Sequence, residues 1–218
     1  MTLQSLSRLS RQLRVLSAVA LMTSAAHAVP EAQFEPAFQQ FLQASRGNDA
    51  AIEKSADAFS ALLKSEPSNP VLLAYAGAST SMKATTTWLP WKKMSHAEDG
   101  MAMLDKALAL LTPAHNAALQ HGTSAVLEVR FVAANTFLAV PGFMNRGARG
   151  AKLLNEVLTS PLLASSPLEF RGEVWLAGAA LAAKEKRAEE ARKYLNQVIQ
   201  TNAPQAPAAR AQLKAITS

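Results

Sequence analysis

A recurring helical pattern is the feature of this sequence that most restricts its fold. In four places a small residue is followed by apolar residues four, seven and eight positions later, and then by a proline about one turn further on. These segments are Ser55-Phe59-Leu62-Leu63 before Pro67, Gly100-Leu104-Ala107-Leu108 before Pro113, Gly150-Leu154-Val157-Leu158 before Pro161, and Ala191-Leu195-Val198-Ile199 before Pro204. Apolar residues at this spacing share one face of a helix, so each segment predicts an amphipathic helix.

A second apolar helical pattern precedes each of these segments, over residues 34–45, 71–82, 124–138 and 168–183. A single helix pair cannot bury its apolar face alone, whereas stacked pairs complete one another's core. Strand signals are weak, because no run of alternating apolar and polar residues is bounded by an Asn-Gly or Asp-Gly turn. The sequence therefore predicts an all-α fold of about four stacked antiparallel helix hairpins.

Two of the predicted pairs resemble the tetratricopeptide repeat family. The motif of the first helix is similar at Leu73-Ala76-Gly77 and at Trp175-Gly178-Ala179, and the motif of the second helix is similar in the segments that begin at Ser55 and Ala191. The resemblance implies a small exported bacterial member of that family, built as an interaction module. The middle pairs are longer than the family's repeat of about 34 residues, so a more general α-solenoid or an irregular helical bundle is an open alternative.

Residues 1–28 have the organisation of a secretory signal peptide. Three arginines come first, an apolar run of small residues follows over 15–26, and Ala26-His27-Ala28 supplies a small-x-small cleavage site. We therefore expect residues 29–218 to form the mature, exported chain, periplasmic or secreted. The alternative is an amphipathic N-terminal helix of a cytosolic protein.

The chain has no cysteine, which excludes disulfides, thiol chemistry and a lipid-acceptor cysteine at the cleavage site.

The charge of the chain gives no indication of nucleic-acid binding. The formal net charge is +6, with three of the 22 basic residues and none of the 16 acidic residues lying in residues 1–28, so residues 29–218 carry +3. A nucleic-acid-binding protein would need a clustered basic face. No segment after residue 28 is apolar enough to predict a transmembrane helix.

Two long connections between paired helices are the predicted functional regions, at residues 84–96 and 140–150. In a stack of hairpins such connections emerge on one edge, so we expect the two to lie about 10 Å apart, the usual helix-packing distance. Tryptophan and arginine are enriched in the energetically dominant parts of protein interfaces. The candidate partner-binding residues are Trp88, Trp91, Lys92, Lys93, Phe143, Arg146 and Arg149.

Two other interpretations of these connections remain open. The aromatic side chains could fold back over the helices and only fill a gap beneath the loop. Alternatively, the segment from Trp88 to Lys93 could contact lipid headgroups, because its two indole rings and two lysines favour that environment.

No motif predicts a reaction, a cofactor or a metal site. Ser95 and Glu98 predict a helix start with a capping box around His96, and we expect His115 and His121 to face solvent. Glu128 and Glu173 could line a concave face as paired carboxylates, but ion pairs between helices explain such residues more simply.

The sequence thus predicts a non-catalytic scaffold that binds a protein or peptide of the bacterial cell envelope. A helical protein that binds lipid or another hydrophobic ligand is the first alternative, and a cell-wall-active enzyme is the second.

Overall fold

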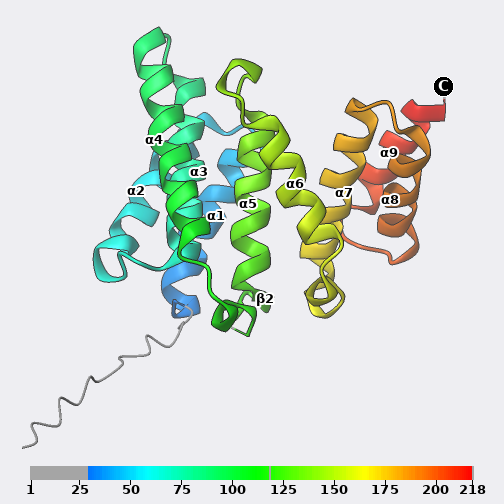
Figure 1. Ribbon diagram of the computed structural model, residues 1–218, viewed down its shortest axis with the longest axis horizontal. Coiled ribbons are helices and arrows are strands. Elements are labelled where there is room, and N and C mark those ends of the chain that lie inside the picture. Colours follow the sequence, from blue (N-terminus) through cyan, green and yellow to red (C-terminus); the bar gives the residue numbers. More distant parts are fainter. Residues whose placement is uncertain (1–28, 118, 218) are drawn as a thin grey trace, which may run out of the picture.

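The computed structural model describes residues 29–117 and 119–217, so the predicted signal peptide lies outside the described residues. The described chain is almost entirely helical (Figure 1), which confirms the predicted all-α fold. The α-helices are α1 (Glu31–Ser45), α2 (Asp49–Ser65), α3 (Pro70–Thr86), α4 (Pro90–Ala109), α5 (Ala125–Ala139), α6 (Gly147–Leu158), α7 (Leu168–Lys184), α8 (Ala188–Gln200) and α9 (Ala206–Thr217). Three short 3₁₀ turns, η1 (Pro113–Asn116), η2 (Gly142–Met144) and η3 (Pro161–Ser165), lie in the connections.

Neighbouring helices pack as antiparallel hairpins, α1 with α2, α3 with α4, α5 with α6 and α7 with α8. The first three pairs are joined chiefly through α3, which also packs on α2 and α5, whereas the α7–α8 pair packs on α6. The C-terminal helix α9 was not predicted. It packs on α8 and helps to cover an apolar cluster that contains Leu195 and Val198. In a stack of hairpins, such a helix covers an apolar face that would otherwise meet water.

The core is centred on α3 and α5, which are apolar on most sides. Every residue of α3 from Pro70 to Ser79 is buried, and α5 is buried continuously from Ala125 to Val129. A helix that is apolar all round is buried all round. The amphipathic helices α6 and α8 instead bury one face, through Leu154 and Val157 in α6 and through Leu195 and Val198 in α8.

Two glycines allow α3 and α4 to approach closely. A Cβ atom at Gly77 would lie 2.7 Å from the carbonyl oxygen of Gly100, and a Cβ atom at Gly100 would lie 2.6 Å from the backbone nitrogen of Ser81. Both distances are shorter than van der Waals contact, so only glycine fits at this crossing. Gly77 and Gly100, noted in the sequence as small residues of a repeat pattern, therefore set the distance between the paired helices.

The predicted connection at 84–96 is much shorter than expected. Helix α3 continues to Thr86 and α4 already begins at Pro90, so the non-helical link is residues 87–89. Pro90 occupies the first turn of α4, where proline's missing N–H and fixed φ are compatible with a helix. The prediction that Ser95 caps a new helix is wrong. Ser95 lies inside α4, and its hydroxyl group donates to Oδ2 of Asp99 at 3.1 Å.

The second predicted connection, 140–150, is also partly helical. It contains η2, and α6 begins at Gly147 rather than after Gly150. Gly150 is buried against α5, because a Cβ atom there would lie 3.0 Å from the carbonyl oxygen of Ala134. The connection between α5 and α6 therefore spans only residues 140–146 and contains the 3₁₀ turn η2.

A two-residue strand pair, β1 (Leu119–Gln120) with β2 (Thr123–Ser124), precedes α5 and was not predicted. The turn between the strands is His121-Gly122, and both residues have positive φ angles, 50° and 72°. Two positive φ values are typical of a type I′ hairpin turn. The expectation that His121 faces solvent is wrong, because its ring packs against the rings of Phe34 and Phe38 in α1.

Candidate functional site

The tip between α3 and α4 carries the most exposed apolar surface in the described residues. The side chains of Trp88 and Trp91 are 83% and 67% exposed, and Met94 is also exposed. Three of the five exposed large apolar side chains in residues 29–117 and 119–217 thus lie within seven positions of one another. Exposed apolar residues that cluster in this way mark interaction surfaces.

The same tip is positively charged. Lys92 and Lys93 are exposed in the first turns of α4, and no acidic residue occurs between positions 84 and 97. We call Trp88, Trp91, Lys92, Lys93 and Met94 the tryptophan tip. The indole rings do not fold back over the helices, so the interpretation of Trp88 and Trp91 as gap-filling residues does not fit their exposure.

The connection between α5 and α6 presents one exposed aromatic ring and two restrained arginines. Phe143 is 68% exposed. Arg146 and Arg149 both bind the carboxylate of Asp105 in α4, at 3.0 Å and 2.5 Å. Their guanidinium groups also lie over the ring of Phe137, each 5.3 Å from its centroid. The two arginines therefore have partners within the chain, unlike the tryptophans.

The two predicted connections lie at the same end of the helices (Figure 1) but not at the same level. Asp105 is about 15 residues from the start of α4 at Pro90, which corresponds to about 22 Å along a helix axis. The arginine groups that contact Asp105 are therefore farther from the tryptophan tip than the expected 10 Å. The candidate residues divide into the tryptophan tip and a separate group around Phe143.

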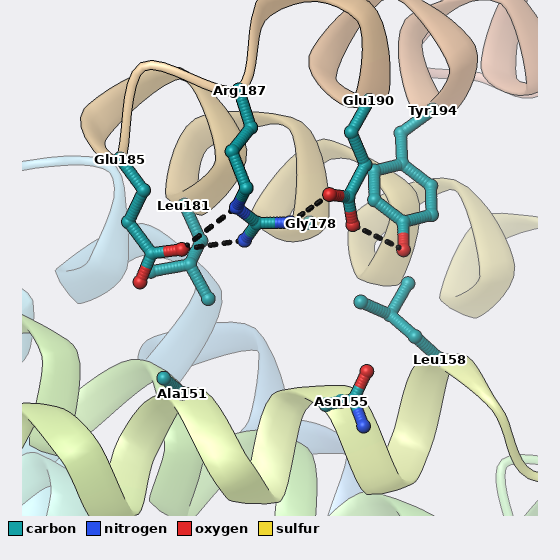
Figure 2. A pocket seen from close by; sticks show the side chains of 9 residues that line it. All are labelled: Ala151, Asn155, Leu158, Gly178, Leu181, Glu185, Arg187, Glu190 and Tyr194. Carbon is teal, nitrogen blue, oxygen red and sulfur yellow. Dashed lines mark hydrogen bonds and ion pairs between the residues drawn. The ribbon is translucent and has the colours of Figure 1, made fainter.

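A small pocket lies between α6, α7 and α8 (Figure 2), and none of the candidate partner-binding residues lines it. Arg187 crosses its mouth and pairs with Glu185 and Glu190, while the hydroxyl group of Tyr194 donates to Oε1 of Glu190 at 3.3 Å. The volume of the pocket is about 180 Å³, below the roughly 300–1,000 Å³ of typical ligand pockets. Its charged groups already pair with one another, so we do not assign a ligand to it.

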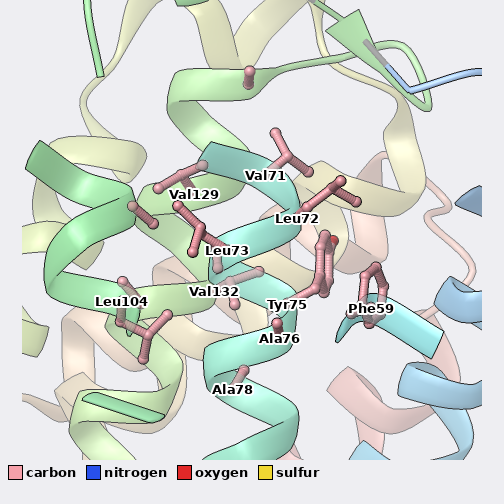
Figure 3. Close-up of a cluster of buried hydrophobic side chains, with 14 of the residues drawn as sticks. Phe59, Val71, Leu72, Leu73, Tyr75, Ala76, Ala78, Leu104, Val129 and Val132 are labelled. Carbon is pink, nitrogen blue, oxygen red and sulfur yellow. The ribbon is translucent and has the colours of Figure 1, made fainter. Parts of the chain in front are cut away.

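The predicted pair of carboxylates, Glu128 and Glu173, does not form. Glu128 is 3% exposed in the core between α3 and α5, where the hydroxyl group of Tyr75 donates to its Oε1 at 2.6 Å. Figure 3 shows the ring of Tyr75 beside that of Phe59 within the apolar cluster. Glu173 is exposed on α7 and accepts a hydrogen bond from Gln205 at 2.9 Å. The two residues therefore share no open face.

Burial determines the ionisation of this buried pair. Removal from water raises the pKa of the Glu128 carboxyl group to about 8, against a smaller lowering by the hydrogen bond from Tyr75, and the negative charge of Glu31 raises it further. Burial also raises the pKa of Tyr75 well above its usual value. The carboxyl group of Glu128 therefore keeps its proton at neutral pH inside an apolar core. Neither residue lines the pocket between α6, α7 and α8, so we treat the pair as structural.

Comparison with known proteins found no match, whether among family models, curated proteins or solved structures. The resemblance to tetratricopeptide repeats therefore stays a prediction from the sequence. No helix in the described part of the chain combines the length and the apolar character needed to cross a membrane.

Proposed function

We propose that this protein is a non-catalytic, exported interaction module of the bacterial cell envelope that binds another protein through its tryptophan tip. The single observation that carries the proposal is the exposure of Trp88, Trp91 and Met94 together on one tip. Each exposed indole costs free energy in water, and a partner's apolar pocket would remove that cost. The leader pattern in residues 1–28 supports export.

The chemistry of the tip favours a particular kind of partner. Lys92 and Lys93 directly follow Trp91, and no acidic residue lies near them in the sequence. Complementary charge steers association and opposes wrong partners. The expected partner surface is an apolar pocket that accepts Trp88 or Trp91 and has acidic residues at its rim.

A lipid surface is the less favoured occupant. Electrostatic attraction to anionic lipids contributes about 1 kcal/mol for each lysine near the surface, so Lys92 and Lys93 together supply about 2 kcal/mol. The tip is also short, because α4 continues directly into helical residues that pack on α3. Two indoles in a protein pocket bury roughly 150–250 Å² each, and tryptophan is among the residue types that dominate such interfaces.

The test uses a photo-crosslinking amino acid in the full chain, expressed in bacterial cells. Benzoylphenylalanine at position 91 should give one discrete protein adduct, and the additional substitution Trp88→Ala should reduce that adduct at least about fivefold. Leu119 provides the matched control position, because it is an exposed large apolar residue in β1, away from the tip. Benzoylphenylalanine at position 119 should give no such adduct.

Two results would overturn this proposal. One is the absence of an adduct that depends on position 91. The other is sedimentation of the chain with phosphatidylglycerol vesicles that is lost in Trp88→Ala/Trp91→Ala, which would assign the tip to lipid.

Export is tested separately by mass spectrometry of the chain recovered from the periplasm or medium. The expected N-terminal residue is Val29. Recovery of the uncleaved chain from the cytoplasm alone would contradict the export part of the proposal and leave the binding part to the crosslinking result.

A further inference from the structure

Outside the tryptophan tip, two carboxylates and one imidazole meet where α1 contacts the β1–β2 turn. Glu31 and Glu35 are four positions apart, so they lie on the same face of α1. Nδ1 of His121 is 2.5 Å from Oε1 of Glu31, and its Nε2 is 3.5 Å from Oε2 of Glu35. One potential ligand atom from each of the three side chains lies within 4.8 Å of the others.

Neighbouring contacts hold this group in place. The side-chain amide of Gln120 accepts from the backbone nitrogen of Val29 at 3.1 Å and donates to Oε2 of Glu31 at 3.1 Å. The ring of His121 packs with centroid distances of 4.9 Å and 4.5 Å against Phe34 and Phe38. The start of α1 and the β1–β2 turn are therefore fixed relative to each other, which places the ring of His121 beside Glu31 before any ligand binds.

Two features of the group are unexplained by its contacts within the chain. Nε2 of His121 is buried and has no hydrogen-bond partner, although it points toward the carboxylate of Glu35. In addition, His121 is the only basic side chain among the described residues that forms an ion pair with Glu31 or Glu35. Two carboxylates thus face a single imidazole. The negative charge of Glu31 also acts in the interior, where it contributes to the raised pKa of Glu128 after the larger effect of burial.

We propose that Glu31, Glu35 and His121 form a binding site for a divalent transition-metal ion, with Zn²⁺ as the best fit. A cation would neutralise the excess negative charge and give the unpartnered ring nitrogen a ligand role. Imidazole together with carboxylate suits Zn²⁺, whereas Mg²⁺ and Ca²⁺ prefer oxygen ligands alone.

The geometry needs only small adjustments. Zinc lies about 2.0–2.2 Å from nitrogen and oxygen ligands, so tetrahedral ligand atoms are about 3.4 Å apart. The candidate ligand atoms lie within 4.8 Å of one another, and the side chains of Glu31 and Glu35 are about half-exposed, so they have room to adjust. Three protein ligands leave a fourth position for water or another ligand.

The test measures binding of zinc chloride alone to the tag-free, full chain after treatment with a chelator. Isothermal titration calorimetry should show one ion bound per chain, and added zinc should raise the melting temperature, because an ion that binds only the folded state stabilises it. Cobalt(II) in place of zinc should give visible absorption bands. Glu35→Gln and His121→Gln should each lower the zinc affinity at least tenfold.

The control exploits the small number of histidines in this chain, which are His27, His96, His115 and His121. The triple variant His27→Ala/His96→Ala/His115→Ala keeps only His121 and should retain the zinc affinity of the wild type within about twofold. Glu35 is half-exposed, so Glu35→Gln should fold normally, as circular dichroism without zinc can verify. If His121→Gln fails to fold, the zinc affinity of Glu35→Gln alone tests the proposed site.

The proposal is overturned if zinc shows no saturable binding to the wild type, which would leave the group as an ion-paired contact between α1 and the turn. Loss of binding in the triple variant, or unchanged affinity in Glu35→Gln, would equally overturn it by assigning zinc to other histidines. None of these outcomes depends on a binding partner, so the test of the metal site is independent of the test of the tryptophan tip.

Discussion

The hydroxyl group of Tyr75 donates a 2.6 Å hydrogen bond to Oε1 of Glu128, linking α3 to α5 inside the core. The other carboxyl oxygen, Oε2, is buried without a hydrogen-bond partner in the described residues. A buried carboxyl group with one satisfied oxygen is costly when ionised. The contact between these two central helices is therefore sensitive to pH.

Glu128→Gln should stabilise the protein at neutral and alkaline pH. The pKa of Glu128 is raised from 4.5 to about 8 in the folded state. The stability associated with this group is therefore fully present below pH 4.5 and is lost as the pH rises toward 8. At 1.36 kcal/mol per pKa unit, the loss reaches about 3 kcal/mol at pH 7. Glutamine keeps an acceptor for Tyr75 and has no proton to lose.

The measurement is the free energy of unfolding in urea for wild type and Glu128→Gln between pH 4 and pH 9. The difference should grow by about 3 kcal/mol from pH 4 to pH 7 and level off above pH 8. Glu173→Gln is the matched control, because Glu173 is exposed on α7. A difference that does not change with pH would contradict the raised pKa of Glu128.

Tyr75→Phe should destabilise the protein by about 1–3 kcal/mol, because it removes the hydrogen bond to a buried carboxyl group. The ring contacts should survive, including the stack on Phe59 with a centroid distance of 5.0 Å. Since the hydrogen bond from Tyr75 lowers the pKa of Glu128, the destabilisation should be larger at pH 9 than at pH 6. Denaturant unfolding at the two pH values checks this, and an equal loss at both would count against it.

Gly100→Ala should destabilise the protein by at least about 2 kcal/mol, because the new methyl group would overlap Ser81 and the carbonyl oxygen of Gly77. Gly147→Ala is the matched control, since a Cβ atom there meets nothing within 4 Å. Alanine is favoured over glycine in helices by up to about 1 kcal/mol, so Gly147→Ala should be neutral or slightly stabilising. Thermal unfolding compares the two variants, and similar melting temperatures for Gly100→Ala and Gly147→Ala would refute the close crossing of α3 and α4.

The hydroxyl groups of Ser55 and Ser79 form a fully buried hydrogen bond of 2.7 Å between α2 and α3. Either serine-to-alanine substitution leaves the other hydroxyl unpaired and should cost about 1–3 kcal/mol. The double variant Ser55→Ala/Ser79→Ala should cost less than the sum of the two single losses, by about 1 kcal/mol. A double-mutant cycle in urea measures this coupling, and strict additivity would show that the pair contributes no interaction.

The sequence predicted individual helices better than it predicted their ends. Helix α3, predicted over residues 71–82, begins at Pro70, and the side chain of Asn69 accepts hydrogen bonds from the backbone nitrogens of Val71 and Leu72. The start of α4 was placed too late, because the capping residues at 95 and 98 fit a helix start as well as a helix interior. Pro90 was the stronger signal, since proline at the first turn marks a helix start directly.

The candidate site was predicted in part. Four residues of the tryptophan tip were candidates from the sequence and are exposed in the structure, whereas Met94 was not a candidate; the role of the tip stays a proposal. The pairing of His121 with Glu31 and Glu35 was missed. Their only local signals were the four-residue spacing of the glutamates and a His-Gly pair suited to a turn, and neither indicates a contact about 90 residues away in the chain.

Apolar periodicity, glycine and proline placement determined the helices and their pairing, because these features act through neighbouring residues on the same backbone. Only the tertiary structure decided which polar groups became buried together, as for Tyr75 with Glu128 and for His121 with the carboxylates of α1. Such pairings depend on the angle and separation at which one hairpin stacks on the next. That geometry arises from packing between distant segments, and no local sequence pattern predicts it.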